Sequence, residues 1–405
     1  MADLTQTAER PAAGVSDRVR RRQLFYVGGF DPASPRKYHA IFSAEAPRQA
    51  ALDGAAIQTG PLEDRGDLSA GWTVDARFGD EAVRTDYEFL RWYDIVRRVW
   101  PKDDLGLFVG IWTSFFDYHR SGIMAAARRD APVVALASSM PVVWSTIFFL
   151  IYASVLAGAC AAGGAVARTL GLPAWTGELP PLLLVLAVFV VWRWADRFVN
   201  VAWLARGMIC VVRAARGDYP DLDARCEAFA RRLIAADRAE DADEILVVGH
   251  SMGSQLVGQA IAKALDADPQ FGRRRARVNL LTLGQLIPFY TLLTADPAYR
   301  RDLQALAQAR RIGWVDITSP ADGGSAAAMH PLEGVMTTPP ADRPSRRSPR
   351  FHALMSPDNY KSLRRRPLDY HFAYLRAMDV AGDYDFFRLT TGPYFLTPPP
   401  VHGAR

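Results

Sequence analysis

The chain has 405 residues, 50% of them hydrophobic, which is enough to form a complete buried core and excludes a mainly disordered protein. Its formal net charge of +5 arises from 48 Lys and Arg against 43 Asp and Glu. The basic residues form short scattered clusters rather than the continuous patch of a nucleic-acid-binding protein, so we expect no nucleic-acid partner. The three cysteines form no Cys-x-x-Cys pair and have no histidine at zinc-ligand spacing, so we predict no metal and no other cofactor.

The first 130 residues begin with a polar segment and continue with strand and helix patterns. Residues 1–22 are rich in Ala, Arg and Asp without periodicity, which predicts a flexible leader, and no signal-peptide-like apolar segment precedes residue 24. Residues 24–27 form a short apolar run before a Gly-Gly pair, the pattern of a buried strand entering a tight turn. We predict a second strand at 72–78 and a helix at 87–100, so that 23–130 form the first part of a folded domain.

A long apolar segment follows this part of the chain. Residues 131–167 carry no charge, and this length exceeds the ~20 apolar residues of a membrane-spanning helix. Pro132 and Pro141 disfavour an earlier helical interior, and the Gly-Gly pair after residue 162 supplies a stop. We therefore place a spanning helix at 140–162.

A second apolar run, residues 180–192, has only 13 residues and is short for a membrane crossing. It becomes long enough if Arg193 and Arg197 extend toward the lipid headgroups beside Trp192 and Trp194. Together the two runs predict a transmembrane helical hairpin over 131–205. The alternative is a hairpin buried inside a soluble domain.

The remaining chain alternates strand and helix patterns, which predicts class α/β with a mostly parallel sheet flanked by helices. An irregular surface loop at 338–350 and a last short helix at 371–378 complete the expected order. The expected elements are helices at 222–238, 252–265 and 299–309 and strands at 245–248, 278–283 and 312–318.

The strongest motif is Gly249-His250-Ser251-Met252-Gly253, which lies between an expected strand and an expected helix. A G-x-S-x-G pentapeptide in this context forms a sharp turn that lifts the serine hydroxyl above the end of the sheet. The small residues two before and two after the serine avoid clashes in the turn. This pattern predicts a nucleophilic serine at position 251; an ordinary Gly-rich strand-to-helix turn is the alternative.

With this motif the chain resembles the α/β-hydrolase superfamily, and in particular its lipase and esterase branch, over residues 23–100 and 220–380. The resemblance implies an α/β-hydrolase-type sheet with the hairpin inserted before the nucleophile strand. It also implies that 206–385 form the second part of the hydrolase domain and that 386–405 form a C-terminal tail. In this family an oxyanion hole takes one amide from the loop after an early strand, here Phe30, and one from the residue after the nucleophile, here Met252.

The resemblance further implies an acid and a histidine after the serine, in that order. Asp322 lies on the loop beyond the strand at 312–318, whereas its rival Asp316 lies within that strand, so we assign Asp322 as the acid. His371 stands in an H-x-x-Y pattern like that of many lipases, and we assign it as the general base. The other histidines after the acid are His330, His352 and His402.

These assignments predict a membrane-anchored serine hydrolase that cleaves carboxylic esters, with membrane lipids as partners and as possible substrates. Phe30 precedes the hairpin and Ser251 follows it, so a shared site requires an even number of crossings. Arginines flank the hairpin on the domain side, which by the positive-inside rule predicts a cytoplasmic catalytic domain on an integral membrane protein. The alternative is a hydrolase-fold domain that has lost catalysis and serves as a membrane scaffold or lipid-binding protein.

Overall fold

The computed structural model describes residues 18–177 and 179–398. Its centre is a nine-stranded sheet in the order β2-β4-β5-β1-β6-β7-β8-β9, with β3 paired to β4. Neighbouring strands are parallel from β5 across to β9 and antiparallel on the β4 side. The predicted class, α/β with a mostly parallel sheet flanked by helices, is confirmed. The strands are β1 Arg21–Val27, β2 Ala56–Thr59, β3 Glu63–Asp64, β4 Ser69–Phe78, β5 Glu81–Leu90, β6 Glu244–His250, β7 Arg277–Leu283, β8 Gly313–Ile317 and β9 Ser345–Arg347.

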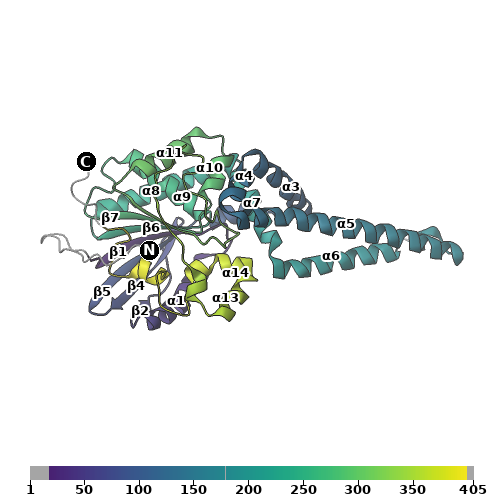
Figure 1. Ribbon diagram of the computed structural model, residues 1–405, viewed down its shortest axis with the longest axis horizontal. Coiled ribbons are helices and arrows are strands. Elements are labelled where there is room, and N and C mark those ends of the chain that lie inside the picture. The colour runs from purple at the N-terminus through teal and green to yellow at the C-terminus, as the bar shows by residue number, and fades with distance from the viewer. Residues whose placement is uncertain (1–17, 178, 399–405) are drawn as a thin grey trace.

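Helices cover both faces of the sheet (Figure 1). Helices α8 to α11 pack on the face that carries Phe25 and Val247, and α1 with α12 to α15 pack on the face that carries Leu24 and Leu246. The helices are α1 Pro35–Leu52, α2 Tyr93–Val99, α3 Asp104–Arg120, α4 Ile123–Asp130, α5 Pro132–Thr169, α6 Leu179–Val199, α7 Val201–Ala215, α8 Asp221–Ala239, α9 Gly253–Ala267, α10 Ile287–Leu293, α11 Pro297–Gln308, α12 Phe351–Leu354, α13 Pro357–Arg364, α14 Pro367–His371 and α15 Phe386–Thr391, with short 3-10 turns η1 Ala174–Gly177 and η2 Ala373–Leu375.

The central strands bring two distant loops together. Every residue of β6 is buried, as expected for a parallel strand that is covered on both faces. Strand β1 is paired in parallel with β6, with Val27 opposite Gly249. The loop that begins at Gly28 and the loop that holds Ser251 therefore leave the same edge of the sheet side by side.

The helix predicted at 87–100 is wrong in its first part. Residues Glu81–Leu90 form β5, and the helix α2 begins only at Tyr93. Tyr87 stacks on Trp72 of β4 with ring centroids 4.1 Å apart. Helical spacing of the apolar residues is compatible with either element, and here pairing with β1 on one side and β4 on the other decides for the strand.

The C-terminal part also differs from expectation. The loop predicted at 338–350 contains β9, and the helix predicted at 371–378 is instead the end of α14 followed by the turn η2. Residues 386–398 include α15 and pack into the core, although a tail was predicted over 386–405, of which 399–405 lie outside the described residues. Buried Arg22 holds this segment, because its guanidinium donates to the carbonyls of Thr390 and Gly392 at 3.0 Å and pairs with Glu244 at 2.6 Å.

The apolar insertion forms a hairpin that projects from one end of the domain (Figure 1). Both of its helices are long and apolar enough to cross a membrane. The hairpin is not buried in the domain, since large apolar side chains are exposed along it. They include Val143, Ile147, Phe149, Leu150, Ile151 and Val166 on α5 and Leu182, Leu183, Leu186, Val190 and Val191 on α6.

Helix α5 is longer than predicted at both ends. It begins at Pro132 and continues through Pro141 to Thr169. The first residue of a helix donates no hydrogen bond within the helix, so the missing N–H of proline is tolerated there. The Gly-Gly pair does not end the helix. A Cβ on Gly163 would lie 2.1 Å from the carbonyl oxygen of Gly177, so this glycine permits close contact with the turn of the hairpin.

Candidate active site

Ser251 occupies a strained turn between β6 and α9. Its φ is +56°, a left-handed backbone conformation that is uncommon for residues other than glycine. The flanking glycines are sterically required: a Cβ on Gly249 would lie 2.6 Å from the Cα of Ser254, and one on Gly253 would lie 2.2 Å from the carbonyl oxygen of Val27. The G-x-S-x-G motif therefore has the steric role that the sequence predicts.

Hydrogen bonds hold this turn at the end of the sheet. The N–H of Ser251 donates to the carbonyl of Leu283 at the end of β7, at 2.9 Å. The N–H of Ser254 donates to the carbonyl of Ser251 at 3.0 Å, and the Ser254 hydroxyl donates to the carbonyl of Gly249 at 2.9 Å. The strain at Ser251 is thus balanced by contacts on both sides.

The structure brings together the predicted acid, Asp322, and the predicted general base, His371. Asp322 lies on the loop after β8, and its Oδ2 accepts a hydrogen bond from Nδ1 of His371 at 2.9 Å. Its carboxylate also accepts from the Tyr374 hydroxyl and from the N–H of Gly324, both at 3.0 Å. Burial alone would raise the pKa of Asp322, but the neighbouring His371 and these donors lower it below its usual range.

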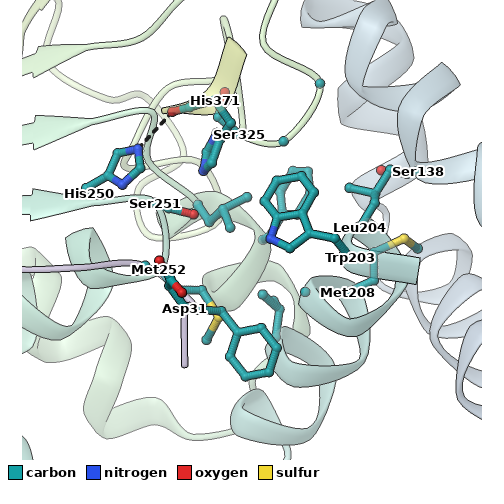
Figure 2. A pocket seen from close by; sticks show the side chains of 18 of the residues that line it. Asp31, Ser138, Trp203, Leu204, Met208, His250, Ser251, Met252, Ser325 and His371 are labelled. Atoms are coloured by element: carbon teal, nitrogen blue, oxygen red, sulfur yellow. Dashed lines mark hydrogen bonds between the residues drawn. The ribbon is translucent and has the colours of Figure 1, made fainter. Parts of the chain in front are cut away.

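This pairing determines how His371 can act. An ionised carboxylate only accepts hydrogen bonds, so the neutral imidazole carries its proton on Nδ1 and leaves the lone pair of Nε2 free. Nε2 is buried and has no hydrogen-bond partner among the described residues. His371 and Ser251 line the same cavity (Figure 2), although they are not hydrogen-bonded in this conformation.

The rival residues lie elsewhere. Asp316 accepts a hydrogen bond from the hydroxyl of Thr282 at 2.7 Å, and burial raises its pKa to about 7. Neither it nor His330 lines the cavity. His330 accepts from the N–H of Leu332, and His352 is exposed. His402 lies outside the described residues.

His250 supports the histidine rather than transferring a proton. Its Nε2 donates to the carbonyl of His371 at 3.0 Å, drawn as the dashed line in Figure 2, and the two rings are 4.9 Å apart. Burial and the neighbouring His371 lower the pKa of His250 to about 3, so it is neutral at physiological pH. The hydrogen bond indicates an orienting role for this residue.

The loop after β1 lies against the Ser251 turn. A Cβ on Gly29 would lie 2.7 Å from the Cβ of Ser251, so only glycine fits there. Trp92 fixes the loop by donating to the carbonyl of Gly28 at 2.8 Å. Among the hydrogen bonds of the described residues, none has the N–H of Phe30 or Met252 as its donor. Both residues are buried beside Ser251, so two amides are available to hold an oxyanion.

The wall opposite the serine was not predicted. Figure 2 shows Ser251 and His371 on one side of the cavity and Trp203, Leu204 and Met208 of α7 on the other. The ring of Trp203 lies 5.5 Å from that of His371. The apolar residues of α7 recur at helical spacing directly after the hairpin, a signal that could have predicted the helix but not its position over the site. The cavity measures about 50 Å³.

Comparisons with protein-family models, with characterised proteins and with solved structures find no match for this chain. An assignment of function therefore depends on the geometry of the site. Within residues 18–177 and 179–398, no group of three or more His, Cys, Asp or Glu side chains is placed to hold a metal ion.

Proposed function

We propose that this chain is a membrane-anchored serine hydrolase of the α/β-hydrolase type that cleaves carboxylic esters. The observation that carries the proposal is the strained Ser251 turn in one cavity with a His371 side chain that is oriented by Asp322. The chain order of serine, acid and histidine is that of α/β-hydrolases. The parallel arrangement of β1, β6, β7 and β8 is compatible with this fold type.

In the proposed mechanism Nε2 of His371 removes the proton from the Ser251 hydroxyl as Oγ forms a bond to the ester carbonyl carbon. The amides of Phe30 and Met252 hold the negative oxygen of the tetrahedral intermediate. The bond to the alcohol oxygen then breaks, and the alcohol leaves with the proton from His371. Water then donates a proton to Nε2 of His371 as its oxygen forms a bond to the acyl carbon. The bond between this carbon and Oγ breaks, Oγ takes the proton from His371, and the carboxylic acid leaves.

Hydrolysis of p-nitrophenyl butyrate by the full chain tests this proposal. We expect turnover by the wild type and its loss in Ser251→Ala. Ser43→Ala is a matched control, because the Ser43 hydroxyl on α1 is buried without a hydrogen-bond partner and Ser43 does not line the cavity. Equal rates in the wild type and Ser251→Ala would refute the proposal.

A catalytically inactive scaffold of the same fold is the second candidate. It is favoured by one observation, the unpartnered Nε2 of His371. Catalytic hydrogen bonds are often long before substrate binds, so we prefer the enzyme. Well-folded wild-type protein that turns over no ester would support the scaffold.

Membrane anchoring is the second part of the proposal. Phe30 precedes the hairpin and Ser251 follows it, and both line one cavity, so the chain crosses the bilayer an even number of times. Arg128 and Arg129 precede the hairpin, Arg193 lies after the apolar run 180–192 near the end of α6, and Arg206 follows the hairpin. The positive-inside rule then places the hydrolase domain in the cytoplasm, with η1 outside.

Single cysteines at Ala33, Ala267 and Thr176 test this orientation with an impermeant thiol reagent on intact cells. Cys160 is replaced by Ser, whereas Cys210 and Cys226 are buried and their thiol pKa values are raised by burial, so they stay unreactive. We expect labelling at Thr176 alone. Labelling at Ala33 or Ala267 without labelling at Thr176 would show the reverse orientation. Labelling at only one of Ala33 and Ala267 would exclude a shared site.

A further inference from the structure

Helix α3 carries an apolar face that the described chain leaves open. Leu105 is 73% exposed, Val109 52% and Phe116 54%. Their spacing of four and seven residues places them on one side of the helix, with half-buried Trp112 between them. The opposite side, which includes Leu107 and Ile111, packs into the domain.

This face lies at the root of the hairpin, where α3, α4 and α7 gather in Figure 1. An ion pair of 3.1 Å joins Asp104 of α3 to Arg193 of α6. Between α3 and the hairpin lies an apolar groove of about 290 Å³, which is lined by residues of both, among them Leu105 and Phe108 of α3 and Phe148 and Trp192 of the hairpin. Tryptophan and arginine at this point are typical of the level of lipid headgroups.

The charges of α3 are arranged to tolerate an anionic surface. Asp103 caps the helix through the N–H of Gly106, Asp104 is paired with Arg193, and Asp117 is paired with Arg216 at 2.6 Å. Lys102 and Arg120, which flank the helix, are exposed. A helix with an apolar face, with two of its carboxylates paired to arginines and with exposed basic residues at or beside its ends, is suited to lie in the interface of a bilayer.

Helix α7 connects this surface to the candidate site. Ile209 of α7 packs closely on α3, since a Cβ on Gly110 would lie 2.5 Å from its Cδ1. Other residues of α7, among them Trp203 and Met208, form the wall opposite Ser251. The cavity of about 50 Å³ is far smaller than the ~300–1,000 Å³ of pockets that enclose whole ligands. Because Trp203 and Met208 of α7 line the cavity together with Ser251, a long substrate would extend past α7.

We infer that α3 lies in the membrane interface and that the substrate is an ester lipid of the adjacent leaflet, which reaches Ser251 past α7 while its chains stay in the bilayer. The part concerning the substrate rests on the proposed hydrolase function. The part concerning α3 does not.

The position of α3 is tested with an environment-sensitive fluorophore on Val109→Cys, in the full chain carrying Cys160→Ser and reconstituted in phosphatidylcholine and phosphatidylglycerol vesicles. Val380→Cys is the matched control, because Val380 is 49% exposed and lies in the C-terminal part of the domain. Brominated lipids should quench the label at 109 and not at 380. Equal quenching at both sites would overturn the interfacial position, as would cross-linking at 109 between two copies of the chain without quenching.

The substrate is tested with L105S/V109S/F116S, with V380S as control. Hydrolysis of dioleoylglycerol in vesicles should fall roughly tenfold in the triple variant, because the apolar face no longer holds the domain against the leaflet. Hydrolysis of soluble p-nitrophenyl butyrate should stay unchanged. Turnover of the soluble ester without turnover of the lipid by the wild type, or an equal loss of both in the variant, would overturn the lipid substrate. If the wild type hydrolyses neither, the proposed function itself fails, and the quenching result still decides the position of α3.

Discussion

The candidate site buries polar groups, whereas the hairpin exposes apolar groups. Both arrangements are unfavourable in water unless other contacts compensate for them. At the end of the sheet, Asp322 and His371 are buried polar groups, and each is paired. Along the hairpin, apolar side chains such as Phe149 and Leu183 are exposed. Burial of polar groups is unfavourable unless hydrogen bonds replace water, and exposure of a large apolar surface is unfavourable unless another apolar phase covers it. Under the proposed function, a substrate contacts the first region and lipid covers the second.

The largest expected effect concerns the site. His371→Ala and Asp322→Asn should each lower turnover of p-nitrophenyl butyrate roughly 10³-fold or more while the protein stays folded, because the base or its orientation is lost. Asp316→Asn is the control, since Asp316 bonds to Thr282 and not to His371. Loss of activity in Asp316→Asn with retention in Asp322→Asn would show that the acid is misassigned.

A charge introduced into the hairpin should reduce the amount of protein in the membrane without changing the activity of the site. Leu186→Lys places a charge on an exposed position in the middle of the apolar run of α6, which costs roughly 3 kcal/mol at the centre of a membrane helix. We expect less protein in the membrane fraction and an unchanged rate per folded molecule on the soluble ester. Leu52→Lys, at an exposed position on α1, is the control. Equal membrane fractions for the two variants would mean that α6 does not contact lipid.

The oxyanion loop should tolerate almost no added volume. In Gly29→Ala the new methyl group would lie 2.7 Å from the Cβ of Ser251, so loop and serine must move apart. We expect a loss of roughly 10²-fold in turnover, the typical result of a shift of about 1 Å in a catalytic group. Gly258→Ala on α9 is the control, with its nearest contact at 3.4 Å. Wild-type turnover in Gly29→Ala would argue against an oxyanion hole at this loop.

The smallest effect concerns stability and pH. Burial raises the folded-state pKa of Asp316 to about 7, above the ~3.9 of an unfolded aspartate. Between pH values of about 4 and 7 the folded state therefore binds more protons than the unfolded state. The Asp316 carboxyl makes the protein less stable as the pH rises through this range. Asp316→Asn removes the ionisation, so its melting temperature relative to the wild type should increase across this range. A constant difference would indicate an ordinary pKa for Asp316.

The sequence predicted the parts of the fold that depend on local patterns. The strand, turn and helix around Ser251 were predicted correctly, because short-range sterics require glycines there. The pairing of Asp322 with His371 in the structure agrees with an assignment made from chain order and resemblance. Its catalytic role stays a prediction.

What could not be predicted depends on long-range contacts. The C-terminal segment was expected to be a tail, yet it is held by Arg22 from the opposite end of the chain. Residues 87–90 of β5 were mistaken for part of a helix because their apolar spacing fits either element, and a local pattern does not show the pairing with β1 and β4 that decides for the strand. The α7 wall of the cavity follows only from the way the hairpin returns the chain to the domain.

The most direct test of the central claim is covalent capture of the nucleophile. Purified full-length protein is treated with a fluorophosphonate, and the modified peptide is identified by mass spectrometry. We predict a single adduct on Ser251, slow or absent labelling in His371→Ala, and no labelling in Ser251→Ala. Absence of an adduct from folded wild-type protein, or an adduct that persists in Ser251→Ala, would contradict the account.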